Sequence, residues 1–300
     1  MTWQRLIKFR APQGQTHYGD PIINHADELL QKLEAKTLKA KVFEGSSIPA
    51  LKPTGTEVEV AELIGPLTPA DVPIVKCIGL NYMKHIKEAG RTPPPYPSIF
   101  IKGAPSIASW NEDIPIHPII QKPDMLDYEG EMCILIGKDA KNVPREKALD
   151  YIAGYMVGND ISARSWQRDP KFAGNVPQWC FAKGFDKFAP VGPMLVSPSV
   201  VGLAENLRLQ TLVNGEMRQD TNTDDLIFSV ADIVSFSSQG TTLQEGTVIM
   251  TGTPSGVALG MDPPGWLKDG DVVEVKIEQL GSIRNRMVWE HGSMVWQKPS

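Results

Sequence analysis

The stretch at residues 127–137, DYEGEMCILIG, decides the fold class, because its two halves carry opposite signals. The second half is an apolar run rich in branched side chains, which predicts a buried strand. The first half places acids at alternate positions: Asp127, Glu129 and Glu131. Because residues i and i+2 of an extended chain point to the same face, we expect these carboxylates to crowd one side of the strand. Such crowding is unfavourable unless water, protonation or a bound cation relieves it.

The composition around this stretch is that of an ordinary globular protein. Of the 300 residues, 41% are hydrophobic and 22% are charged, which is enough to build a sizeable core. The formal net charge of −5 gives no basic stripe, so we expect no nucleic-acid partner. The apolar runs are too short to span a bilayer, so we expect no membrane partner either.

The chain start and the cysteines bear on the compartment. The start, MTWQRLIKFR, lacks the apolar region of a signal peptide. Its basic residues also fit a mitochondrial transit peptide, but a first strand at 3–9 explains them better. The three cysteines are odd in number and scattered, which argues against a disulfide framework and a cysteine-rich zinc site. We therefore expect reduced thiols and a cytoplasmic protein.

The chain divides at about residue 73. Residues 1–73 predict a small N-terminal α/β domain, with an amphipathic helix at 25–36 and a loop at 46–56. From residue 74 the pattern changes to short strands separated by glycine and proline, at 74–78, 99–102, 132–136, 155–157, 207–213 and 272–277. Asn214-Gly215 predicts a hairpin, and helices are expected at 145–152 and 225–236. Without regular βαβ alternation, these elements predict an α+β, mostly β fold, with a catalytic domain at 74–292 and a tail at 293–300.

A third acid follows another short strand. Asp160 ends the segment 155–160 among small residues, where it could face Glu129 and Glu131 across neighbouring strands. Together they would form an all-oxygen ligand set, suited to Mg²⁺, Mn²⁺ or Ca²⁺ and poorly matched to Zn²⁺ or copper. Exposure of the acids to water at the mouth of the strand stays open as the alternative.

Other candidate functional residues lie in three further segments. His85 and Glu88 have the i, i+3 spacing that brings two side chains together on one helical face. A carboxylate that holds an imidazole prepares it to take a proton from water, although an exposed surface pair has the same spacing. The proline-rich loop at 91–97 would suit a lid. Lys183 lies in an apolar setting, where it either reaches the surface or pairs with an anion. Thr253, in the turn-like TGTPSG at 251–256, could donate to a substrate carboxylate.

Taken together and in this order, these segments resemble the fumarylacetoacetate hydrolase family, with its fumarylacetoacetase C-terminal-like domain. The resemblance covers roughly residues 74–290. It rests on IGLNYMKHIKEAG (78–90), PSIFIKGAPSI (97–107), DYEGEMCILIGKDAKNV (127–143), GYMVGNDISARSWQ (154–167), QWCFAKGFDKFAPVGP (178–193), LVNGEMRQ (212–219), VIMTGTPSGVALG (248–260) and GDVVEVKIEQLGSIRNRMV (270–288).

The resemblance implies a mixed β-roll catalytic domain of this family's type, a small N-terminal domain and a homodimer. It also implies the roles of the candidate residues. Mg²⁺ or Mn²⁺, with Ca²⁺ as a non-native occupant, would be bound by Glu129, Glu131 and Asp160. The catalytic residues would be His85 and Glu88 in a lid, with Lys183 beside the metal. The positions that contact substrate would be Lys102, Arg164, Gln167 and Thr253. The family's lysine segment usually continues directly into proline, whereas two residues intervene between Lys102 and Pro105 here.

The implied activity is cleavage of a C–C bond in small 2-oxo acids, in which the metal polarises the keto group. The intact His85–Glu88 pair favours hydrolysis of an acylpyruvate. Two enzymatic alternatives stay open, a decarboxylase of oxaloacetate-type acids and an isomerase of hydroxymuconate-like acids. A different class is a catalytically silent scaffold that keeps the fold and the metal.

Overall fold

The structure of this chain is a computed structural model that describes residues 2–88, 90–292 and 294–296. Its N-terminal part contains the strands β1 (Arg5–Arg10), β2 (Thr16–Pro21), β3 (Lys39–Glu44), β4 (Lys52–Glu59) and β5 (Glu62–Leu63), with the helix α1 (Glu28–Glu34). Leu29 of α1 is buried, which agrees with the predicted amphipathic spacing. The predicted loop at 46–56 is wrong in its second half. β4 has exposed, polar side chains, but its backbone pairs with β3.

One large mixed sheet joins the N-terminal strands to the rest of the chain. Its order is β4-β3-β2-β1-β14-β12-β11-β17-β6-β7. The members not yet given are β6 (Val75–Gly79), β7 (Ser98–Lys102), β11 (Gly130–Ile136), β12 (Ile152–Asn159), β14 (Ala189–Val196) and β17 (Val248–Met250). β1 pairs with β14, so the two predicted domains share this sheet. The division near residue 73 stays a prediction, and the predicted tail at 293–300 lies mostly outside the described residues.

A second sheet packs against the middle of the first. Its order is β16-β15-β18-β19-β9, with β9 (Ile114–Ile116), β15 (Arg208–Val213), β16 (Glu216–Asn222), β18 (Val272–Ile277) and β19 (Gly281–Trp289). β11, β12 and β14 contact strands of this sheet, and the apolar side chains between them form the core. The predicted hairpin is confirmed, since Asn214 and Gly215 have φ of 51° and 84° between β15 and β16.

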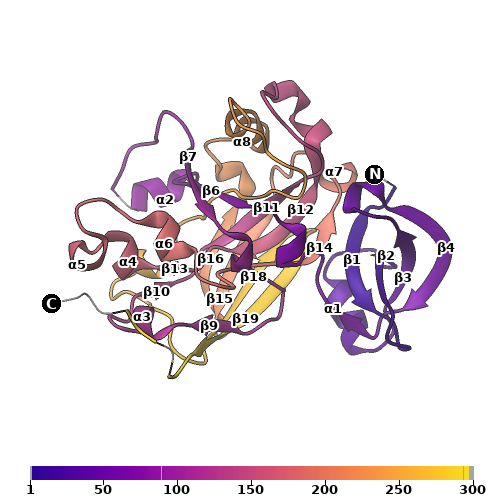
Figure 1. The fold of residues 1–300 in the computed structure, drawn as a ribbon, viewed down its shortest axis with the longest axis horizontal. Helices are drawn as coiled ribbons and strands as arrows, with labels where there is room; N and C mark the ends of the chain where they lie inside the picture. The colour runs from indigo at the N-terminus through magenta and orange to yellow at the C-terminus, as the bar shows by residue number, and fades with distance from the viewer. Residues whose placement is uncertain (1, 89, 293, 297–300) are drawn as a thin grey trace.

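The helices are short and sit at the edges of the sheets. They are α2 (Met83–Glu88), α3 (Pro118–Gln121), α4 (Arg164–Arg168), α5 (Pro170–Ala173), α6 (Trp179–Lys183), α7 (Pro198–Val201) and α8 (Val230–Ser237). The predicted helix at 145–152 is a 3₁₀ helix, Arg145–Tyr151. The helix predicted from residue 225 begins later, because Ser229 and Asp232 form a capping box that sets its start. Figure 1 shows α2, α4 and α6 grouped on the side of the molecule away from β1–β4.

Three short strands complete the fold: β8 (Ile107–Ala108), β10 (Leu126–Asp127) and β13 (Ser162–Ala163). Mostly β, with mixed sheets and short helices, the architecture confirms the predicted α+β class. None of the described helices is long and apolar enough to cross a membrane.

Candidate active site

The acidic stretch is not one continuous strand. β10 ends at Asp127 and pairs with β13, whereas β11 begins at Gly130 and pairs with β12 and β17. The expectation that three acids crowd one face of a single strand is therefore wrong for Asp127. Its buried carboxylate accepts from Arg164 Nε at 2.7 Å and from the backbone N–H groups of Ala258 at 2.7 Å and Leu259 at 3.3 Å. Asp127 thus fixes the guanidinium of Arg164.

The other two acids meet Asp160. Oxygens of Glu129, Glu131 and Asp160 all lie within 4.8 Å of one another, and all three residues are buried. Asp160 directly follows β12, which pairs with β11 in a register that places Asn159 opposite Gly130. The backbone N–H of Asp160 donates to the carbonyl of Glu129 at 2.8 Å. The sheet therefore brings together acids about thirty residues apart in sequence.

Three cations contact two of these acids. Lys183 Nζ lies 2.8 Å from Glu129 Oε2 and 2.6 Å from Asp160 Oδ2, and Lys102 Nζ lies 2.5 Å from Asp160 Oδ1. Arg164 Nη2 donates to Glu129 Oε1 at 2.5 Å. Burial alone would raise the pKa of Glu129, but Lys183 and Arg164 lower it to about 2. Burial likewise opposes the charge of Lys183, but Asp160 and Glu129 raise its pKa above the ordinary value.

Glu131 is different, because in the described part of the chain it has no cationic partner. Its Oε2 accepts from the backbone N–H of Gly252 at 2.7 Å. Burial, Asp160 and Glu129 together raise its pKa well above the ordinary value. A carboxylate in this position favours an additional cation, and all the candidate ligand atoms are carboxylate oxygens. The residues therefore fit a hard divalent cation such as Mg²⁺ or Mn²⁺.

The helix α2 carries the predicted His85–Glu88 pair. His85 Nδ1 lies 3.0 Å from Glu88 Oε2. Burial alone would raise the pKa of Glu88, but His85 and the backbone N–H of Gly256, which donates to Glu88 Oε1 at 3.0 Å, lower it. Gly260 lies so close that a Cβ there would be 2.7 Å from the Glu88 carboxyl carbon. The loop after β17 thus holds the end of α2.

Thr253 belongs to the same loop. Its hydroxyl accepts from Gln219 Nε2 at 2.9 Å and donates to the carbonyl of Gly130 at 3.1 Å. These bonds attach the loop to the start of β11, beside the acids. The candidate substrate residue Thr253 therefore has its hydroxyl engaged within the protein.

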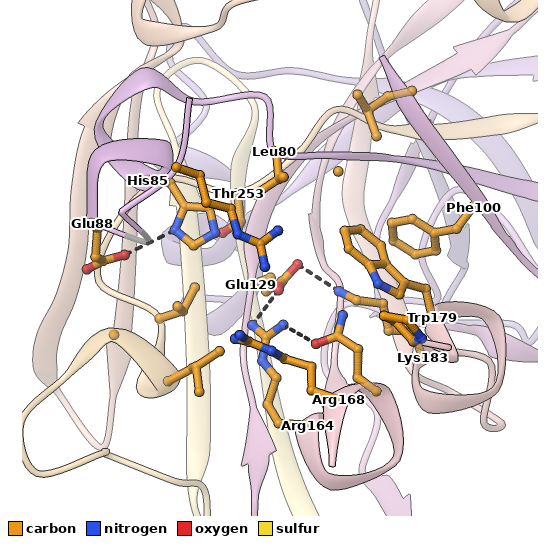
Figure 2. Close-up of a pocket in the computed structure, with 18 residues that line it drawn as sticks. Leu80, His85, Glu88, Phe100, Glu129, Arg164, Arg168, Trp179, Lys183 and Thr253 are labelled. Carbon is orange, nitrogen blue, oxygen red and sulfur yellow. Dashed lines mark hydrogen bonds and ion pairs between the residues drawn. The ribbon is translucent and has the colours of Figure 1, made fainter. Parts of the chain in front are cut away.

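A cavity of about 330 Å³ lies above the acids. Figure 2 shows His85 and Glu88 on one side, Trp179 and Lys183 on the other, and Glu129 and Arg164 between them. The predicted site residues that line the cavity are His85, Glu88, Glu129, Arg164, Gln167, Lys183 and Thr253. Three predicted site residues lie behind this lining. Asp160 pairs with Lys183 of the lining and with Lys102 behind it, and Glu131 lies in the carboxylate cluster with Glu129 and Asp160.

The lining residues that sequence reasoning did not assign to the site include Arg91, Phe100, Arg168 and Trp179. The ring of Trp179 packs edge-on against Phe100, with centroids 5.2 Å apart, and Lys183 Nζ lies 5.1 Å from the Phe100 centroid. A signal was available for two of them. Trp179 precedes Lys183 by four residues, one helical turn, and Arg168 directly follows Gln167.

The fumarylacetoacetate (FAA) hydrolase C-terminal family matches residues 74–288, most of the chain and all the residues of this site. The chain belongs to the fumarylacetoacetate hydrolase family. Two curated members of the family are similar over nearly the whole length. Caffeoylpyruvate hydrolase from Neonothopanus nambi is 38% identical, over 95% of this chain and 93% of the relative. Human mitochondrial oxaloacetate tautomerase FAHD2A is 35% identical, over 95% of this chain and 91% of the relative.

A solved structure in the fumarylacetoacetate hydrolase family shows the same fold. It is fumarylpyruvate hydrolase from Pseudomonas aeruginosa in complex with Mn²⁺ and pyruvate. The two structures superpose with a TM-score of 0.64 at 33% sequence identity, and the match covers 73% of this chain and 91% of the fumarylpyruvate hydrolase chain.

Proposed function

We propose that this chain is a Mg²⁺- or Mn²⁺-dependent enzyme that hydrolyses a C–C bond in acylpyruvates. The observation that carries the proposal is the His85–Glu88 pair held over the buried acids. The ion would be bound by Glu129, Glu131 and Asp160. When bound, it would supply positive charge to the carboxylate and keto oxygens of a 2-oxo acid. The Mn²⁺ and pyruvate in the related fumarylpyruvate hydrolase structure support this assignment.

His85 would act as the general base. Because the carboxylate of Glu88 can only accept, its contact with His85 Nδ1 at 3.0 Å would keep the proton on Nδ1 and leave Nε2 to accept one. His85 Nε2 would take a proton from water, whose oxygen attacks the acyl carbonyl. The C–C bond then breaks, its electron pair stays on the pyruvate fragment, and His85 returns the proton to that carbon. The products are pyruvate and a carboxylic acid.

The polar residues that line the cavity beside the acids would orient the substrate. Arg164 Nη1 donates to Gln167 Oε1 at 2.9 Å, so the two side chains form one polar unit at the cavity wall. Arg164 and Gln167 would bind the 2-oxo acid carboxylate. Lys183 would place positive charge beside the electron pair that the broken bond leaves behind. Lys102 would support Asp160 from behind, and Thr253 would fix the loop that faces the substrate.

A second candidate is an enzyme that acts on oxaloacetate. The human relative named as an oxaloacetate tautomerase, 35% identical over 95% of the chain, favours it. Moving a proton between carbon and oxygen needs a base such as His85 but no attacking water. Decarboxylation would need neither, because the departing group is already a carboxylate.

A turnover assay with acetylpyruvate and oxaloacetate, each in Mg²⁺, Mn²⁺ and EDTA, distinguishes these functions. We expect acetylpyruvate cleavage to pyruvate and acetate that EDTA abolishes. In His85→Gln the rate should fall by about 100-fold or more, while the affinity for Mg²⁺ stays unchanged. His25→Gln, an exposed histidine that does not line the cavity, is the matched control. Turnover of oxaloacetate alone would replace the hydrolase proposal, and Mg²⁺ binding without turnover of either would support a scaffold.

Compartment and assembly are part of the same proposal. The three cysteines are free, which supports a reducing compartment such as the cytoplasm. Relatives named as mitochondrial make the mitochondrion the alternative. We also propose a homodimer, on family membership alone, and gel filtration with light scattering would test it.

A further inference from the structure

Tyr128 is a buried residue between the end of β10 and the start of β11. Its ring packs in the apolar core, but its hydroxyl reaches the loop after β17 and donates to the carbonyl of Gly256 at 2.9 Å. The sulfur of Met261, 3.8 Å from the hydroxyl, is only a weak second acceptor. The break between the two strands therefore directs one polar atom from the core to this loop.

Gly256 connects Tyr128 to the proposed general base. Its backbone N–H donates to Glu88 Oε1 at 3.0 Å, and the other oxygen of Glu88 lies 3.0 Å from His85 Nδ1 (Figure 2). Gly256 has a φ of 95°, and a Cβ there would overlap the carbonyl oxygen of Arg218, so the position requires glycine. Because glycine has no side chain to restrict its backbone, contacts from outside set the direction of its peptide groups. The Tyr128 hydroxyl supplies such a contact at the carbonyl.

The His85–Glu88 pair is held only weakly by its own helix. α2 has six residues, and the side chains of His85 and Glu88 are 15% and 24% exposed, so water competes for their contact. An i, i+3 pair of this kind contributes little by itself. Glu88 gains further restraint from the loop, through the N–H of Gly256 and the close packing of Gly260 against its carboxyl group. The orientation of His85 therefore depends on the position of the loop at 256–260.

We propose that Tyr128 is a positioning residue, whose hydroxyl fixes Gly256 so that Gly256 holds Glu88 against His85. This inference rests on the proposed function, which makes His85 Nε2 the base. Without the hydroxyl, the Gly256 carbonyl loses its partner and the N–H on its other side is no longer fixed. Glu88 then leaves Nδ1 in part of the molecules, and the imidazole proton moves to Nε2, which cannot then accept one from water. Asp127 still holds the far end of the loop, so we expect a partial loss.

Tyr128→Phe removes the hydroxyl and keeps the buried ring. With acetylpyruvate and Mg²⁺, we expect kcat to fall by about fivefold to tenfold, whereas KM and the Kd for Mg²⁺ change by less than about twofold. Tyr155→Phe is the matched control, because this buried hydroxyl also donates to a glycine carbonyl, that of Gly202 at 3.0 Å, and does not line the cavity. Both variants lose the same kind of hydrogen bond, so an equal loss of kcat in both would reduce Tyr128 to a structural role and overturn the proposal.

Nitrogen NMR of the full-length, Mg²⁺-loaded chain with ¹⁵N-labelled histidine measures the tautomer without turnover. The spectra are recorded at about pH 8, where an ordinary imidazole is neutral. His85→Gln identifies the signals of His85 among the five histidines. In the parent we expect the proton on Nδ1. In Tyr128→Phe the Nδ1 and Nε2 shifts should move toward each other as the two tautomers mix, and Tyr155→Phe should leave them unchanged. Unchanged shifts in Tyr128→Phe overturn the proposal.

A Glu88→Gln background tests whether Tyr128 acts through Glu88. In this background Tyr128→Phe should cause no further loss of kcat, because the contact that the hydroxyl supports is already altered. A loss of the same size in both backgrounds would overturn the route through Glu88. If acetylpyruvate is not cleaved at all, the hydrolase proposal fails, whereas histidine shifts that move in Tyr128→Phe but not in Tyr155→Phe still support the positioning role.

Discussion

Replacing Glu131 by glutamine separates the metal site from the fold. Glu131 is 2% exposed, and its oxygens lie within 4.8 Å of oxygens from Glu129 and Asp160. At that separation and an effective dielectric constant of about 20, two unit negative charges repel by about 3.5 kcal/mol. Glutamine keeps the shape of the side chain and the acceptor for Gly252 but removes both repulsions.

The same change should weaken metal binding. Removing one partner of a buried charge pair costs about 3 kcal/mol, which is about a 100-fold rise in the Kd for Mg²⁺. In EDTA the variant should be at least as stable as the parent, because Glu131 no longer has to be buried with its charge or take up a proton. A mutation that damaged the fold would instead lower the stability in EDTA.

Calorimetric titration with Mg²⁺ and thermal unfolding in EDTA measure the two effects. Glu57→Gln, an exposed acid of β4, is the matched control and should change neither quantity. An unchanged Kd for Mg²⁺ in Glu131→Gln would remove this residue from the metal site. A lower unfolding temperature in EDTA would refute the repulsion argument.

Three further predictions concern the residues around the acids. Asp127→Asn should lower the free energy of unfolding in urea by about 3 kcal/mol, because it removes one of the two carboxylates that pair with the buried Arg164; unchanged stability would contradict this. Gly79→Ala should raise KM for the substrate, because the new Cβ would lie 2.4 Å from the ring of Trp179 and displace the cavity wall. The folded-state pKa of Glu131 is raised, so its contribution to metal-free stability is complete below its ordinary pKa and is lost as the pH rises toward the raised value. Urea unfolding in EDTA should show this loss, at up to about 1.4 kcal/mol per pH unit, and the difference should vanish in Glu131→Gln.

Local sequence patterns identified several of the strands and several candidate residues. The apolar run after Glu131 and the Asn214-Gly215 turn carry signals that depend only on neighbours in sequence, and both formed the expected structure. The loop expected at 46–56 failed for the opposite reason. β4 exists because β3 offers it a partner, and that partner cannot be inferred from the polar residues of β4.

The candidate site likewise depends on strand partners that the local sequence does not indicate. Glu129, Glu131 and Asp160 were grouped by their positions at the ends of two strands, the family resemblance implied that they bind the metal, and the pairing of β11 with β12 brings them together. No pattern indicated that the chain changes strand partners at 128–129, because that depends on β13 and β17, which lie far along the chain. Arg91 was likewise placed in a lid loop, without any sign of which cavity it lines.

The break between β10 and β11 explains why three alternate acids serve two purposes. Asp127 turns away from the cluster and holds Arg164 and the loop after β17. Glu129 contacts both Arg164 and Lys183. In the proposed reaction, Arg164 would bind the substrate carboxylate and Lys183 would lie beside the breaking bond, so both roles depend on this one carboxylate. A change in the charge at Glu129 therefore reaches Arg164 and Lys183 at once. Because Asp127 still fixes Arg164 Nε, such a change alters what Arg164 can bind without releasing it from its place.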